Sequence, residues 1–371
     1  MSAVHAQPGL LEHVLDFESN LHRALAEERV PGAAYAVVAG GRLLHVGGYG
    51  NTDMNGGRPV DPETVFRLAS VSKGFAGTLA ALIAYEGGFA LEEPITRYRS
   101  DFRILGPAEA ITIRHVLGQM TGFTPNAYDN LIEAGKTLDE IIPHFSTLAP
   151  ICQPGSCYTY QNNTFSLIGP VLESATQTPY AELLKHRFFG PLEMKNASIG
   201  YESFMASDNH AEPHVRVRRT WQKGTVSPNY YRVGPAAGVN ASALDMAGWL
   251  IALLGHRPDV LPPEVVDLAT TPTIRTRSDL SHTYWRGHLT DAHYGLGWRV
   301  YHVGEESLIY HGGWVSGYRA DISFSRARDV GLVILTNAEH NVVSELTVGF
   351  WMPILKGGMP SLAALQISSS D

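Results

Sequence analysis

The sequence lacks the features that would tie it to a membrane, a nucleic acid or a metal. None of its 371 residues falls in an apolar run of about 18, the length needed to cross a bilayer. The formal net charge of -8 argues against binding to nucleic acid. No Gly-x-Ser-x-Gly elbow occurs, which argues against an α/β-hydrolase. We therefore expect no membrane span, no nucleic-acid partner and no cofactor.

Cysteine is scarce. Only Cys152 and Cys157 are present, within ICQPGSCYTY, and two cysteines cannot complete a zinc site. The Pro154-Gly155 turn between them favours a disulfide, which fits a periplasmic or secreted protein. Two free thiols in the cytoplasm are the alternative. Residues 3–6 resemble a signal-peptidase site without the charged and apolar segments that precede one, so a removed signal peptide and an ordinary start both stay open.

The order of predicted elements indicates how the chain is organised. A helix from about 9 to 29 and a hairpin around Gly40-Gly41 come first, and a helical middle region follows. Three strand-like runs and a final helix close the chain. This order predicts a sheet domain from residues 8–66 plus 290–357, an inserted mainly helical domain from 67–289, and an active site in the cleft between them. Residues 204–232 are expected to form a long surface excursion.

The run FRLASVSKGF contains Ser70 and Lys73 at the start of an apolar-periodic segment. Residues three apart share a helix face, so the Lys73 amine can reach the Ser70 hydroxyl. A serine nucleophile needs a nearby base, and an amine in a dry site can lose its proton and become one. A capping serine and a solvated lysine would give the same spacing, so this motif is weak alone.

Two later segments fit the same chemistry. Tyr160 can exchange a proton with the serine, and the amide of Asn162 can orient Lys73 or hold a substrate carbonyl. His311-Gly312-Gly313 ends a strand-like run, where glycines let a substrate lie close to the strand edge. Taken singly, a packed tyrosine before a helix and a Gly-Gly turn explain these segments equally well.

Together, Ser70-x-x-Lys73, Tyr160-x-Asn162 and His311-Gly312-Gly313 resemble the three motifs of the class C β-lactamase and penicillin-binding protein superfamily. The resemblance extends from about residue 10 to 357. It implies an α+β, β-lactamase/transpeptidase-like fold, in which an antiparallel sheet is flanked by the N- and C-terminal helices. It further implies an acyl-enzyme on Ser70, with Lys73 and Tyr160 sharing the work of the general base.

The same resemblance assigns the substrate-binding groups. The N–H groups of Ser70 and Trp314 would form the oxyanion hole, and Asn162 would contact the amide side of the substrate. The third motif departs from the Lys-Thr-Gly usual in class C β-lactamases and is closer to D-peptidases and esterases. A neutral His311 would bind a substrate carboxylate less reliably than lysine does, which puts efficient β-lactamase activity in doubt.

These observations predict a serine hydrolase that acts on an amide or ester, such as a β-lactam or a D-amino-acid peptide. A carboxylesterase and a penicillin-binding sensor with slow turnover are the alternatives. The expected partner is a small-molecule or peptide substrate, and the sequence does not define the oligomeric state. A metal site is not expected, because sixteen histidines make chance groupings common. Such groupings are His210 with His214, and His282 with His288 and His293.

Overall fold

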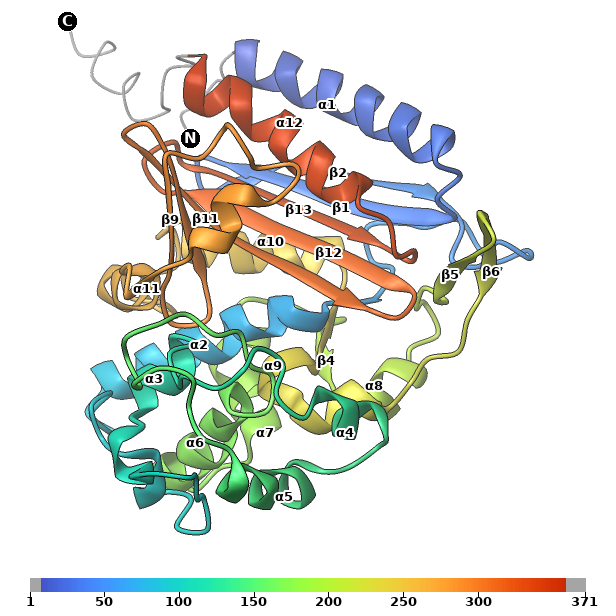
Figure 1. The fold of residues 1–371 in the computed structure, drawn as a ribbon. Helices are drawn as coiled ribbons and strands as arrows, with labels where there is room; N and C mark the ends of the chain where they lie inside the picture. Colours follow the sequence, from blue (N-terminus) through green and yellow to red (C-terminus); the bar gives the residue numbers. More distant parts are fainter. Residues whose placement is uncertain (1–7, 358–371) are drawn as a thin grey trace, which may run out of the picture.

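An eight-stranded antiparallel sheet built from both ends of the chain organises residues 8–357, the part that the computed structural model describes (Figure 1). Its strand order is β2-β1-β13-β12-β11-β10-β9-β8. Strand β1 pairs with both β2 and β13, which joins the first 50 residues to the last strand. This arrangement confirms the α+β prediction. The strands are β1 (Gly32–Ala39), β2 (Arg42–Gly50), β8 (Ile274–Arg275), β9 (Asp291–Tyr294), β10 (Arg299–Val303), β11 (Glu306–Val315), β12 (Tyr318–Ser325) and β13 (Val330–Thr336).

The two terminal helices cover one face of this sheet (Figure 1). Helix α1 (Pro8–Glu27) buries Val14, Leu21 and Leu25 at helical spacing. Helix α12 (Val342–Lys356) packs beside it and against β12 and β13. The side chains of both helices and of this sheet face form one apolar cluster. The predicted flanking by N- and C-terminal helices is therefore confirmed.

Asp321 lies buried under α12 and predicts a pH dependence of stability. Its Oδ2 accepts a hydrogen bond of 3.0 Å from Thr347, while Oδ1 has no partner among the described residues. Burial raises the pKa of Asp321 to about 6, against the opposing influence of Arg319. The pKa of an aspartate in an unfolded chain is about 3.9. The native state therefore binds more protons between about pH 4 and 6, and this group lowers the free energy of unfolding by about 2–3 kcal/mol as pH rises through that window.

In Asp321→Asn protein, we expect the free energy of unfolding not to fall by this amount as the pH rises, because asparagine does not titrate. The measurement is chemical unfolding of both proteins at pH 4.5 and pH 7, because the difference between them cancels other titrating groups. Parallel pH dependences of the two proteins would contradict the assignment.

Helices cover the opposite face of the sheet and continue into the region below it (Figure 1). Helix α10 (Ala243–Leu253) packs directly on β1 and β13 and starts at a capping box between Ser242 and Asp245. Helix α2 (Ser72–Tyr85) lies beneath, where Phe75 stacks on Trp249 of α10 with ring centroids 4.5 Å apart. The other helices are α3 (Ile113–Leu117), α4 (Asp129–Glu133), α5 (Leu138–Ile141), α6 (Ile168–Thr176), α7 (Tyr180–Leu184), α8 (Tyr201–Met205), α9 (Gly234–Ala237) and α11 (Pro263–Thr270).

The region between the sheet-forming ends does not consist of helices alone. Strand β8 comes from it and forms an outer strand of the large sheet. Three short strands make a second sheet in the order β3-β7-β4, with β3 at Phe66–Arg67, β4 at Ser198–Ile199 and β7 at Val239–Ala241. The division of the chain at residues 66/67 and 289/290 stays a prediction.

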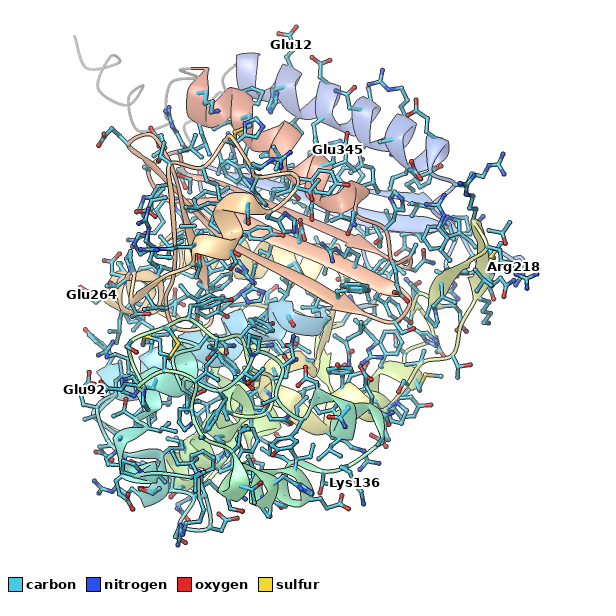
Figure 2. The ribbon with its side chains drawn as sticks, viewed as in Figure 1. Glu12, Glu92, Lys136, Arg218, Glu264 and Glu345 are labelled. Atoms are coloured by element: carbon cyan, nitrogen blue, oxygen red, sulfur yellow. A yellow bond between two sulfur atoms is a disulfide. The ribbon has the colours of Figure 1, made fainter. Side chains whose placement is uncertain are left out.

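Residues 204–232 contain a hairpin of β5 (His214–Val217) and β6 (Thr220–Lys223). Its exposed tip at Arg218 points away from the body of the protein (Figure 2). The base of the hairpin is anchored, because His214 is buried and the Trp221 indole donates a hydrogen bond of 3.0 Å to the Glu28 carbonyl. The expected surface excursion is thus an anchored hairpin with a projecting tip.

Cys152 and Cys157 are joined in a disulfide, with their Cα atoms 6.4 Å apart. This confirms the predicted pairing. No helix within residues 8–357 has the length and apolar character needed to cross a membrane. The segment at 3–6 that resembles a signal-peptidase site lies outside the described residues.

Candidate active site

Ser70 lies in the 3-10 turn η1 (Ala69–Val71), immediately before α2. Its hydroxyl faces a cavity of about 440 Å³. The preceding residue, Ala69, has φ of 49°, in the left-handed region that costs a non-glycine residue on the order of 1–3 kcal/mol. The packing around η1 maintains this conformation, which fixes where the Ser70 side chain points. The helix that the sequence predicts at Ser70 begins two residues later, at Ser72. It ends at Tyr85, just before Gly87-Gly88.

Lys73 is fully buried on the first turn of α2. Its Nζ lies 3.2 Å from Ser70 Oγ, 2.7 Å from Asn162 Oδ1 and 3.1 Å from the Ala236 carbonyl oxygen. Burial lowers the pKa of Lys73, and this effect exceeds the opposing influence of Tyr160. An amine that loses its proton easily thus lies within hydrogen-bond reach of the Ser70 hydroxyl.

Tyr160 completes the contacts of the serine. Its hydroxyl donates a hydrogen bond of 2.8 Å to Ser70 Oγ, and the centre of its ring lies 4.7 Å from Lys73 Nζ. The segment that carries it is irregular but well anchored. The Tyr160 carbonyl accepts from Asn126 N at 2.8 Å, and Gln119 Oε1 accepts from Gln161 N at 2.6 Å. These bonds hold Tyr160 and Asn162 in front of η1 without a regular element.

The end of β11 passes directly beside η1. A Cβ on Gly313 would lie 2.1 Å from the Leu68 carbonyl oxygen, so only glycine permits this approach of strand and turn. Gly312, Gly313 and Trp314 line the same cavity as Ser70. Strand β10 pairs with β11 only as far as Tyr310, so residues 311–315 are not paired on that side. The structure thus brings the three motifs together around one cavity.

His311 departs from the expected role. Its imidazole is 1% exposed and does not line the cavity, so the structure does not present it to a substrate carboxylate. One ring nitrogen lies 2.9 Å from the Gly312 carbonyl and the other 3.0 Å from the Tyr294 hydroxyl. Burial, together with the charges of Arg299 and Lys73, holds the pKa of His311 well below its usual range. The predicted neutral state therefore agrees with the surroundings, but the predicted contact with substrate does not.

Five charged residues line the cavity that the sequence did not single out as site residues: Asp129, Glu133, Asp279, Arg299 and Arg319. Arg299 begins β10 and forms an ion pair with Asp279. Asp129 is the first residue of α4. Arg319 stacks on Trp314, with its guanidinium carbon 5.7 Å from the ring centroid, and no sequence motif marks it.

The candidate metal ligands do not assemble. Among residues 8–357 there is no group of three or more histidine, cysteine, aspartate or glutamate side chains that could hold a metal ion. His214 instead bonds to backbone groups, with Nδ1 2.9 Å from the Asn337 carbonyl and Nε2 accepting from Met54 N at 3.2 Å.

A family model described as Beta-lactamase matches residues 17–348. The chain belongs to this family. The match confirms the resemblance carried by the three motifs. It covers most of the chain and includes all the residues discussed at the cavity.

One curated relative of this Beta-lactamase family member is distant in sequence. Protein flp of Staphylococcus aureus (strain MW2) is 23% identical over 330 residues, which make up 87% of this chain and 62% of that protein. The chain therefore spans less than two thirds of the length of the curated relatives it matches.

Two solved structures share the fold at 20% identity. The octameric penicillin-binding protein homologue from Pyrococcus abyssi aligns with a TM-score of 0.80 over 93% of this chain and 77% of that one. The D-stereospecific amidohydrolase from Streptomyces sp. aligns with a TM-score of 0.71 over 92% of this chain and 98% of that one.

Proposed function

We propose that this protein is a serine hydrolase that forms an acyl-enzyme on Ser70 and cleaves an amide or an ester. The observation that carries the proposal is that one hydroxyl facing the cavity is in hydrogen-bond contact with both Lys73 Nζ and the Tyr160 hydroxyl. A serine is a weak nucleophile until a neighbouring base takes its proton. Membership of the Beta-lactamase family supports this chemistry.

The three neighbours of Lys73 Nζ favour the lysine as the first base. A neutral amine has two N–H groups, which Asn162 Oδ1 and the Ala236 carbonyl can accept. Its lone pair then faces the Ser70 hydroxyl and can take that proton. As Ser70 Oγ bonds to the substrate carbonyl carbon, Tyr160 donates its proton to the leaving nitrogen or oxygen. The Lys73 proton then restores the phenol, and water releases the acyl group with the same two residues acting in reverse.

Negative charge develops on the carbonyl oxygen during this attack. The N–H groups of Ser70 and Trp314 belong to η1 and β11, which Gly313 allows to approach closely. Two backbone donors on such rigid elements can stabilise the oxyanion with little reorganisation. Trp314 thus takes part through its backbone, while its exposed side chain lines the cavity.

The cavity wall favours a leaving group that carries a carboxylate. Arg299 and Arg319 line it, and the Arg299 guanidinium carbon lies 5.9 Å from the centre of the Tyr160 ring. A leaving group protonated by Tyr160 would lie in the same cavity as Arg319 and as Arg299, which pairs with Asp279, and guanidinium groups bind carboxylates well. This supports β-lactams and D-amino-acid peptides over neutral esters. A carboxylesterase and a slowly deacylating penicillin-binding sensor remain the alternatives to be separated by rate.

The test is a comparison of nitrocefin, a peptide ending in D-Ala-D-Ala and a p-nitrophenyl ester, with Ser70→Ala protein as the blank. We expect the peptide or the β-lactam to have the higher kcat/KM, because each carries a carboxylate. Fast turnover of the ester alone would favour the carboxylesterase. An adduct that forms quickly but is released over hours would favour the sensor.

A further inference from the structure

Asp129 places a carboxylate in the wall of the active-site cavity. It is the first residue of α4, is partly buried, and lines the cavity together with Ser70 and Asn162. Burial raises the pKa of Asp129, so the site holds this group at an energetic cost. The mechanism proposed above does not use it.

The hydrogen bonds of Asp129 determine which way the Asn162 amide points. Asp129 Oδ2 accepts from Asn162 Nδ2 at 2.7 Å, and Asn162 Oδ1 accepts from Lys73 Nζ at 2.7 Å. A carboxylate accepts and cannot donate, and Lys73 Nζ directs an N–H at Asn162 Oδ1 whether the amine is neutral or charged. Both ends of the amide are thus engaged, with the Nδ2 group directed to Asp129.

This arrangement changes what can bind beside Asn162. One of the two N–H groups of Asn162 Nδ2 donates to Asp129, and the other can donate to the carbonyl of an acylated amino group. That carbonyl oxygen would lie beside the Asp129 carboxylate, which repels a second acceptor. A free ammonium group supplies donors and the opposite charge. The other oxygen of Asp129 has only a long contact of 3.4 Å to Asn163 Nδ2, which leaves it able to accept.

We propose that Asp129 is a specificity-determining residue that makes this side of the cavity a site for a free ammonium group on the acyl part of the substrate. The inference rests on the proposed function for the identity of the acyl side. With Arg299 and Arg319 lining the same cavity, the preferred substrate class is a short D-amino-acid peptide or amide with an unblocked amino terminus, which binds more tightly than an N-acylated peptide or a penicillin.

Other charges near the site are compatible with this assignment. Glu133, one turn along α4, lines the same cavity and adds negative charge. Lys73 is the nearest cation, and the Asn162 amide lies between it and Asp129. Burial lowers the pKa of Lys73, which reduces the repulsion between Lys73 and a bound ammonium group.

The test measures binding without turnover. In a Ser70→Ala background, the affinities of D-alanyl-D-alanine and N-acetyl-D-alanyl-D-alanine are compared by calorimetry, since these peptides differ only at the amino group. We expect the free peptide to bind roughly 10- to 100-fold more tightly, the range for a hydrogen-bonded charge. Asp129→Asn keeps an acceptor for Asn162 and removes the charge, so it should reduce the ratio to about one.

Glu109→Gln is the matched control, because it removes one exposed charge that does not line the cavity, and the ratio should change by less than about threefold. Equal affinities, binding of neither peptide, or an unchanged ratio in Asp129→Asn with a native thermal midpoint would each overturn the inference. A failure of the proposed function would give a different result, because Ser70→Ala protein would then still hydrolyse the substrate.

Discussion

Ser70→Ala is expected to lower kcat/KM for every accepted substrate by about 10⁴-fold or more, the range seen when a catalytic serine is removed. Lys73 Nζ and the Tyr160 hydroxyl both contact Ser70 Oγ. Without this oxygen there is no nucleophile for Lys73 to deprotonate. The fold should be unaffected, because the change removes one oxygen that faces the cavity. Steady-state rates and the thermal midpoint of the purified variant are the measurements.

Ser72 supplies the control for this substitution. Its buried hydroxyl accepts a hydrogen bond of 2.9 Å from Val239 N and so joins α2 to β7. Ser72→Ala should reduce stability by about 1–3 kcal/mol, the cost of leaving a buried donor without its partner, and retain most of the activity. If Ser72→Ala abolished hydrolysis while Ser70→Ala preserved it, the assignment of the nucleophile would be wrong.

Tyr160→Phe is expected to lower kcat by about 10²- to 10⁴-fold, the usual contribution of general acid–base catalysis. The variant keeps the ring beside Lys73 but has no proton to donate to the leaving group. The loss should therefore be larger for an amide than for a p-nitrophenyl ester, whose leaving group departs without protonation. Rates on both substrate types across pH 5–10 are the measurement.

The pH profile separates catalysis from packing. The acid limb of the wild-type profile should reflect the loss of a proton by Lys73, whose pKa burial lowers. Tyr160→Phe should keep this acid limb, because the burial of Lys73 is unchanged. An equal loss of rate on amide and ester, or loss of the acid limb together with the rate, would indicate that Tyr160 only packs beside Ser70 and Lys73.

The fold was predictable where it depends on local patterns. The spacing in α1 and α2 and the alternation of strands and helices all lie within short windows, and the joining of the two chain ends followed from their order. Strand β8 was not predicted, since a strand of two residues carries too little pattern to be recognised.

Only the residues of the three motifs could be predicted for the site. Ser70 and Lys73 are linked by helix geometry alone, but His311 illustrates what a motif leaves open. Its side chain is buried and contacts the Tyr294 hydroxyl and the Gly312 carbonyl instead of lining the cavity. The role proposed for Asp129 depends on its contact with Asn162, which is 33 residues away in the sequence. That contact is visible only in the folded chain.

The central claim, an acyl-enzyme on Ser70, is tested most directly by mass spectrometry of protein quenched in acid during turnover of the best substrate. We predict that the added acyl mass is found on the peptide that contains Ser70, and that the Ser70→Ala protein gains no mass. An adduct on another residue, or continued hydrolysis by Ser70→Ala, would contradict the account.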